Sequence, residues 1–135
     1  MNYWLLKSEP SAYSWQQMTK DKKTNWTGVR NYQAANNLKA LKVGDLAFFY
    51  HSNEGKEIVG IVRITKTYSP DPTDKTGKFG MVEVTADKPL KTPLGLADIK
   101  VNTALKNMAF VKQSRLSVSP VTAAEWKTLC TLAGA

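Results

Sequence analysis

The order of the secondary-structure segments that the sequence predicts is the feature that most constrains the fold. The predicted segments are short, and strand-like and helix-like patterns do not alternate regularly along the chain. A parallel, doubly wound sheet requires regular alternation, so that class is disfavoured. We therefore predict an α+β fold: a small, mostly antiparallel sheet of five or six strands that closes into a partial barrel, with short flanking helices.

The predicted strands are the β-branched, aromatic or alternating stretches. The clearest is the alternating run at 58–67, and the polar, proline-containing segment at 69–78 that follows it is expected to be an exposed loop. A second polar loop is expected at 20–25. The other strands are predicted at 3–7, 45–50 and 81–85, with 110–112 and 115–118 forming either a short strand pair or an irregular crossing.

Two helices are predicted by capping boxes, in which Ser or Thr is followed three residues later by Glu or Gln. Ser14 with Gln17 predicts a helix over 15–20, and Thr122 with Glu125 predicts a C-terminal helix. The predicted apolar face of that C-terminal helix comprises Trp126, Leu129 and Leu132.

A third helix is predicted over 30–42, where apolar residues recur at helical spacing and Gly44 follows as a stop. Short helical turns are expected at 96–100 and 103–107. The apolar face of the 30–42 helix comprises Ala34, Leu38 and Leu41.

The length of 135 residues predicts a single domain over 1–135, and a monomer is the default expectation. No stretch approaches the roughly 20 apolar residues of a membrane span. The first residues lack the charged start, apolar run and cleavage site of a signal peptide. We therefore expect a cytoplasmic protein, with association with the nucleoid as one option.

Cys130 and His51 are the only cysteine and the only histidine. One cysteine excludes an intramolecular disulfide and a cysteine-cluster metal site, and one histidine argues against a His-rich metal site. We expect no metal and no cofactor. A nucleophilic device that depends on histidine would have to use His51.

The formal charge of +8 suggests a polyanionic partner, although 16 of the 19 basic residues are lysines, and scattered lysines also serve only to keep a surface soluble. The three arginines are Arg30, Arg63 and Arg115. Arginine suits planar, bidentate or stacked recognition, so these positions carry more information than the lysines do.

Trp26 lies in a polar stretch, where no helical or strand period would bury it. A tryptophan just before a helix can offer a stacking face for a flat ring. The alternative is that Trp26 folds back into a small satellite core.

Several clusters of polar side chains lie at predicted strand ends or at a helix start, where they could line a pocket. Each has a plainer interpretation: a surface ion pair for Lys7 and Glu9, a helix cap for Asn31, and a structural hydrogen bond for His51. The clusters are Lys7, Ser8 and Glu9; Arg30 and Asn31; Tyr50, His51 and Ser52; and Arg115 and Ser117.

These same segments carry a family resemblance. The opening run 3–10, the stretch Trp26 to Ala34, the segment Phe49 to Ser52 and the closing run around Leu116 resemble the EVE domain in order and spacing. The resemblance covers residues 3 to about 130. It implies a PUA-like fold, related to YTH and ASCH domains, and a pocket that takes one modified base flipped out of DNA or RNA, modified cytosine being the expected class.

The resemblance also implies roles by position. Trp26 would be the wall on which the base stacks, Arg30, Asn31 and Tyr32 would give helix-start contacts, and Arg115 would close the rim or hold phosphate. The remaining lining residues would be Lys7, Ser8, Glu9, Tyr50, His51, Ser52 and Ser117. Ala35 departs from the family pattern, which often has a basic residue there, so phosphate binding at that point would be weaker.

We therefore predict a non-catalytic module that recognises a modified nucleobase in DNA or RNA. Two alternatives remain open from the sequence: a nucleotide-processing enzyme with Glu9 or His51 as acid or base, and an adaptor that binds RNA through its basic face without base selection.

Overall fold

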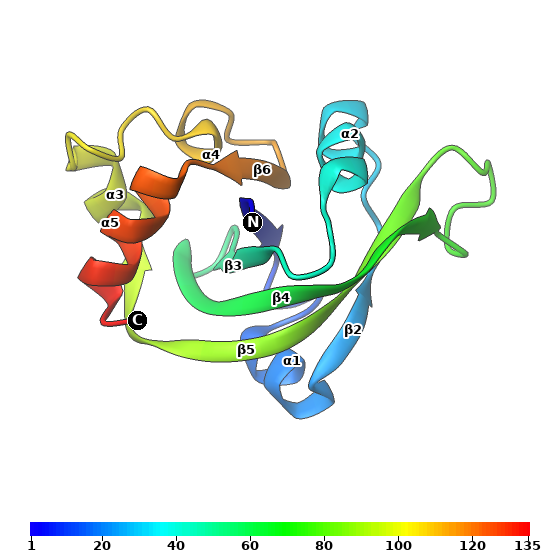
Figure 1. Ribbon diagram of the computed structural model, residues 1–135, viewed down its shortest axis with the longest axis horizontal. Helices are drawn as coiled ribbons and strands as arrows, with labels where there is room; N and C mark the ends of the chain where they lie inside the picture. The colour runs from blue at the N-terminus through cyan, green and yellow to red at the C-terminus, as the bar shows by residue number, and fades with distance from the viewer.

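The computed structural model describes residues 1–135, and its six strands form one curved, mostly antiparallel sheet (Figure 1). The strand order is β2-β5-β4-β3-β1-β6, and β1 with β3 is the only parallel pair. The strands are β1 (Tyr3–Ser8), β2 (Lys23–Trp26), β3 (Leu46–His51), β4 (Glu57–Pro70), β5 (Gly80–Gly95) and β6 (Val118–Val121). The helices are α1 (Trp15–Asp21), α2 (Tyr32–Ala40), α3 (Leu96–Val101), α4 (Ala109–Lys112) and α5 (Ala123–Ala133).

Helix α2 stands where the two edges of the sheet approach each other (Figure 1). It packs against β6 on one side and against β4 and β5 on the other. The Asn37 side-chain amide donates to the carbonyl of Val118 in β6 at 2.7 Å. Strand pairing does not close the sheet, so a helix completes the barrel-like shape. The predicted α+β class is confirmed.

Both faces of the sheet are buried. The concave side holds one apolar cluster, which includes Leu6 and Phe49 and which α1 and α2 help to enclose. The other side holds a second cluster, covered by the C-terminal helices, in which Phe48 stacks on Trp126 with ring centroids 4.0 Å apart. Burial on both faces explains the runs of consecutive buried residues in β1, in β3 and in the first half of β4.

Three local predictions were wrong. In the segment predicted as a loop at 20–25, residues 20–21 end α1 and residues 23–25 belong to β2, which pairs antiparallel with β5. The segment at 110–112 lies in helix α4 rather than in a strand. In α5, Leu132 is 49% exposed and Ala133 is buried in its place, because the helix turns a different residue toward the sheet at its last turn.

The helix caps follow the sequence closely. Thr122 and Glu125 form the predicted capping box in full. Ser14 accepts from the Gln17 N–H at 3.1 Å, but the Gln17 side chain donates to Asp21 instead of returning to the cap. Helix α2 is shorter than predicted because Asn31 caps it, accepting from the Ala34 N–H at 3.0 Å. No helix is both long enough and apolar enough to cross a bilayer.

Gly60 marks the closest approach of a helix residue to the sheet. A Cβ built on Gly60 would overlap the indole ring of Trp15, the first residue of α1. Gly60→Ala should therefore lower the free energy of unfolding by roughly 1–3 kcal/mol, the usual cost of overpacking. Chemical denaturation measures this change in the free energy of unfolding. Gly95→Ala, at an ordinary φ of −73° and with the Asp98 carboxylate at a van der Waals distance of 3.6 Å from the new Cβ, is the control, and it should cost about 0.5–1 kcal/mol because alanine caps a helix less well than glycine. Equal losses in both variants would contradict this packing.

Candidate functional site

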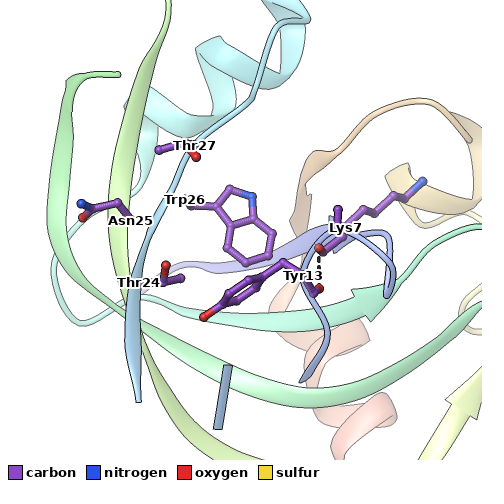
Figure 2. Close-up of a pocket in the computed structure, with 8 residues that line it drawn as sticks. Lys7, Tyr13, Thr24, Asn25, Trp26 and Thr27 are labelled. Atoms are coloured by element: carbon purple, nitrogen blue, oxygen red, sulfur yellow. Dashed lines mark hydrogen bonds between the residues drawn. The ribbon is translucent and has the colours of Figure 1, made fainter. Parts of the chain in front are cut away.

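One pocket of about 320 Å³ opens between β2 and the end of β1, and we call it the Trp26 pocket (Figure 2). Its size lies at the low end of small-molecule sites, which run from about 300 to 1,000 Å³. The lining residues are Lys7 and Ser8 from β1, Ala12 and Tyr13 from the segment that leads to α1, and Thr24, Asn25, Trp26 and Thr27 along β2 and just beyond it.

The pocket contacts β2 along the free edge of that strand. Alternate side chains of a strand point to opposite faces, and Figure 2 draws Trp26 and Thr24 on one side of β2 and Asn25 on the other. Four consecutive residues can line one pocket only if the pocket contacts the strand from the side. β2 is also the last strand of the sheet, so that side has no neighbouring strand.

The register shows which main-chain groups face the open edge. The N–H of Ala86 in β5 donates to the carbonyl of Lys22 at 2.7 Å, so the carbonyl of Lys22 points toward β5, while the N–H of Lys22 donates to the carbonyl of Met18 in α1. In an antiparallel ladder this direction alternates along the strand. The groups of Thr24 and Trp26 therefore also point to β5, and the N–H and C=O of Asn25 point outward. The pocket thus contains a main-chain donor and acceptor with no partner strand.

Trp26 belongs both to the core and to the pocket. Its side chain is only 7% exposed and packs against Phe49 with ring centroids 5.5 Å apart at 90°. Its indole N–H has no partner within the chain, and it is not sealed from solvent, because the Ser119 hydroxyl is the one fully buried side-chain group without a partner. The two interpretations of Trp26 from the sequence, stacking wall and core residue, are therefore compatible.

Tyr13 supplies a second aromatic surface to the same pocket. Its hydroxyl donates to Asp21 at 2.9 Å, and its carbonyl accepts from the Ser8 hydroxyl at 2.7 Å. The bond to Asp21 ties the segment before α1 to the end of α1, and the bond from Ser8 ties it to the end of β1. Burial, together with the bond to the Asp21 carboxylate, raises the pKa of Tyr13, so the ring stays neutral at physiological pH.

Lys7 lies at the boundary between the Trp26 pocket and a second pocket, which we call the lysine pocket. Its ammonium donates to the carbonyl of Ser114 at 2.9 Å and lies 5.8 and 5.6 Å from the ring centroids of Tyr50 and Phe110. Burial lowers the pKa of Lys7 because the charged form is poorly solvated there. A nearby anion would offset that cost.

The structure distributes the other predicted site residues over several places. Tyr50 and Ser52 line the lysine pocket, and Asn31 and Arg115 line a third pocket, the Arg115 pocket. The structure does not bring these residues into the Trp26 pocket. The predicted residues that line none of the three pockets are Glu9, Arg30, Tyr32, His51 and Ser117.

His51 and Glu9 are engaged in hydrogen bonds of their own. The Nε2 atom of His51 accepts the main-chain N–H of Trp15 at 3.0 Å, which helps to hold the start of α1. Burial lowers the pKa of His51, against the opposing charge of Glu57, so the neutral ring that accepts this bond is favoured. Glu9 accepts from the Asn53 side-chain amide at 2.7 Å. The plainer interpretation of His51, a structural hydrogen bond, is the one seen.

Arg30 joins the segment after β2 to the loop that follows β4. Its guanidinium donates to Asp71 at 3.1 Å and to the Thr73 hydroxyl at 2.9 Å, and lies 5.7 Å from the Phe79 ring, on which Tyr32 also packs. Asp71 also accepts from the N–H of Gly28 at 2.9 Å. The loop predicted to be exposed therefore buries its Asp71 side chain completely.

Asp71 is thus a fixed carboxylate that holds Gly28, the residue directly after the lining residue Thr27. Burial alone would raise the pKa of Asp71, but hydrogen bonds from Thr73, Gly28 and Arg30 outweigh it and lower the pKa to about 2. The carboxylate stays charged throughout the physiological range. It holds Gly28, whose φ of +82° favours glycine, and so fixes the path by which the chain leaves β2.

The sequence prediction missed Ala12, Tyr13, Thr24, Asn25 and Thr27 as lining residues. The polar segment before Trp26 was interpreted as a loop, and an edge strand with one polar side gives only a weak strand signal. Lys7 and Ser8 line the same pocket as Trp26, which is the placement that the family resemblance implies. Ala35, which departs from the family pattern, lies in the core at 4% exposure.

A family model described as the EVE domain matches residues 2–132. The chain belongs to the EVE domain family. This confirms the resemblance inferred from the motifs. This EVE domain is 35% identical to chicken thymocyte nuclear protein 1 over 164 residues, which cover 96% of the chain and 68% of that relative.

Solved structures of related proteins share the fold of this EVE domain. A protein of Rhodopseudomonas palustris, with 54% identity, superposes with a TM-score of 0.93 over 99% of this chain and 94% of its own. Human THYN1, determined in complex with DNA that contains 5-methylcytosine, is 32% identical with a TM-score of 0.91, over 100% of this chain and 99% of its own. An ASCH protein of Zymomonas mobilis, 10% identical with a TM-score of 0.61, shares the fold alone.

Asp71 yields a pH prediction for this EVE domain. Because its folded pKa of about 2 lies below the ordinary value of 3.8, its charge stabilises the fold above about pH 4. That stabilisation is lost as the pH falls from 3.8 through 2. The free energy of unfolding, measured with urea at about pH 5.5 and about pH 2.5, should fall further in the wild type than in Asp71→Asn. Parallel falls in the two proteins would show that the Asp71 charge contributes nothing.

Proposed function

We propose that this EVE domain binds DNA by accepting one modified cytosine, flipped out of its strand, into the Trp26 pocket, and that it does so without catalysis. The observation that carries the proposal is the joint presence of an aromatic wall and an unpaired strand edge in one pocket. The bound DNA of the human relative, which contains 5-methylcytosine, supports the choice of ligand.

Both parts of the pocket, the aromatic wall and the unpaired strand edge, are needed to offset the free-energy cost of flipping a base. Flipping a base costs a few kcal/mol. A stack on one aromatic ring returns about 1–3 kcal/mol, and each hydrogen bond to the edge of the base adds about 0.5–1.5 kcal/mol. Trp26 alone would barely offset the cost. The outward N–H and C=O of Asn25 supply a donor and an acceptor for the polar edge of a cytosine, which itself carries both.

The methyl group sets a modest limit to selectivity. Burial of one methyl or methylene group is worth about 0.8 kcal/mol, which corresponds to about fourfold in affinity. We therefore expect a preference for 5-methylcytosine over cytosine of about fourfold when the methyl contacts the pocket wall. A modification that adds a hydrogen bond would raise the preference for the modified base further.

The enzyme alternative is weakened by the environment of its two candidate groups. His51 accepts the Trp15 N–H and Glu9 accepts the Asn53 amide, and neither lines the Trp26 pocket. A general base must reach the proton that it removes. The residues in the pocket instead offer stacking and hydrogen bonding, which are the properties of a binding site.

A DNA-binding function requires that the protein reaches DNA, and the cytoplasmic, nucleoid-associated location stays a prediction from the sequence. The adaptor alternative differs from the proposal in one measurable respect. An adaptor that uses only its +8 charge would bind plain and modified strands equally, with a steep dependence on salt.

Two substitutions at Asn25 test the proposal. The wild-type protein should bind a single-stranded oligonucleotide with one 5-methylcytosine about fourfold more tightly than the unmodified strand. Asn25→Pro removes the outward N–H while sparing the ladder to β5, because proline is tolerated on edge strands. It should weaken binding of both strands about fivefold, the value of one hydrogen bond. Fluorescence anisotropy measures both the preference of the wild type and the loss of affinity in the variant.

Asn25→Ala is the matched control, since it removes the side chain and keeps the main-chain donor. It should bind within about twofold of the wild type, and circular dichroism confirms that both variants fold. Equal wild-type affinity for the plain and modified strands would refute the recognition of modified cytosine. A loss in Asn25→Ala as large as that in Asn25→Pro would refute the role of the main chain.

A further inference from the structure

The lysine pocket, of about 330 Å³, adjoins the Trp26 pocket and shares Lys7 with it. Its floor is aromatic: Tyr50 is 3% and Phe110 2% exposed, and their rings meet edge to face at 5.3 Å. These buried rings give the site a rigid, apolar base. The polar and charged groups of the pocket stand around that base, and they come from segments far apart in the sequence.

Three ammonium groups line the lysine pocket: Lys7 from β1, Lys56 from the β3–β4 loop and Lys100 from α3. No carboxylate lines it. Glu9 accepts from the side-chain amide of Asn53, which lines the pocket. Like charges that share a small site repel one another, and Lys7 is already poorly solvated by burial. An anion in the pocket would relieve both costs.

The main chain at Lys56 is held in place. Its φ of 46° is an unusual conformation for a residue with a side chain. Its carbonyl accepts from the Leu96 N–H at 2.8 Å, next to α3, and the Ser52 N–H at the other end of the loop donates to the Ser8 carbonyl at 2.9 Å. The loop is therefore fixed at both ends, with Lys56 directed to the same pocket as Lys7 and Lys100.

We infer that the lysine pocket binds a backbone phosphate of the nucleic-acid strand, one that neighbours the base in the Trp26 pocket; this inference rests on the proposed function. Lysine binds phosphate as a point charge with three donors and needs no planar partner. Because Lys7 lines both pockets, a strand whose base enters one has its own linkages within reach of the other.

The nucleic-acid strand can continue beyond the lysine pocket, in the direction that leads away from the Trp26 pocket. Ser114, whose carbonyl accepts from Lys7, lines both the lysine pocket and the Arg115 pocket. Lys112 and Arg115 line the latter, again without a carboxylate. Cations therefore follow one another from the base pocket outward over three adjoining pockets. The Arg115 role that the resemblance implies, holding backbone phosphate, is consistent with this path.

The test combines two lysine substitutions with a neutral linkage in the DNA. Lys56→Gln with Lys100→Gln removes two exposed charges and leaves Lys7 and the Trp26 pocket untouched. Methylphosphonate linkages are placed one at a time along an oligonucleotide that carries one 5-methylcytosine. One linkage beside the modified base should weaken wild-type binding about tenfold, because a charge-assisted contact is lost. The double variant should lose less than about twofold at that same linkage, since its partner is already gone.

The matched control is Lys88→Gln with Lys127→Gln. These two lysines line a groove beside α5 that shares no residue with the lysine pocket. Both double variants lower the formal charge from +8 by the same two units, to +6. The control should keep the wild-type profile of linkage sensitivity. A linkage profile of the Lys56 and Lys100 variant that matches those of the wild type and the control would overturn the inference.

The same experiment keeps the two proposals separate. A parallel measurement on an unmodified strand shows whether the protein prefers the modified base. This result does not depend on the lysine substitutions. Loss of linkage sensitivity in the Lys56 and Lys100 variant without any preference for 5-methylcytosine would support the phosphate site and refute the proposed selectivity. Preference for 5-methylcytosine with an unchanged linkage profile would refute the phosphate site alone.

Discussion

The contact between Trp26 and Phe49 is the interaction on which the proposed site depends. β2 is a short edge strand that pairs only with β5, and an isolated edge strand has little to hold its free side in place. The indole ring inserts into the concave core and meets Phe49 edge-on at 5.5 Å, so the strand is anchored from within. The open edge of β2 is thereby kept rigid without a neighbouring strand. Beyond it, Asp71 fixes Gly28 and therefore the exit of the chain toward α2.

Edge strands are usually protected, because unpaired main-chain groups invite association with other strands. Here the free side of β2 borders a pocket that Tyr13 and the end of β1 also line. The main-chain donor and acceptor of this edge are therefore available to a small flat ligand. Lys7 connects this pocket to the cationic pockets beside it, so base recognition and phosphate binding would share one residue.

The sequence predicted the central strands, the caps and the fold class because their signals are local. The capping box at Thr122 and Glu125 and the alternating run within β4 need no tertiary information. The strand β2 was missed because its polar residues carry no strand signal until β5 is present to pair with them. The grouping of Tyr50 and Ser52 with Trp26 was not reproduced, since neighbouring strand ends can face different pockets. The burial of Asp71 depends on Arg30 and Gly28, some forty positions away.

The indole N–H resonances of the four tryptophans offer the most direct test of the account. Trp26 lines the pocket and its indole N–H has no partner in the chain, whereas the indole N–H of Trp4 donates to buried Asp45, and Trp126 of α5 stacks on Phe48 in the other apolar cluster. Titration with an oligonucleotide that carries one 5-methylcytosine should move the Trp26 signal most and leave that of Trp126 in place, with Trp26→Phe giving the assignment. Saturable binding that leaves the Trp26 signal unmoved would contradict the entry of a base into this pocket.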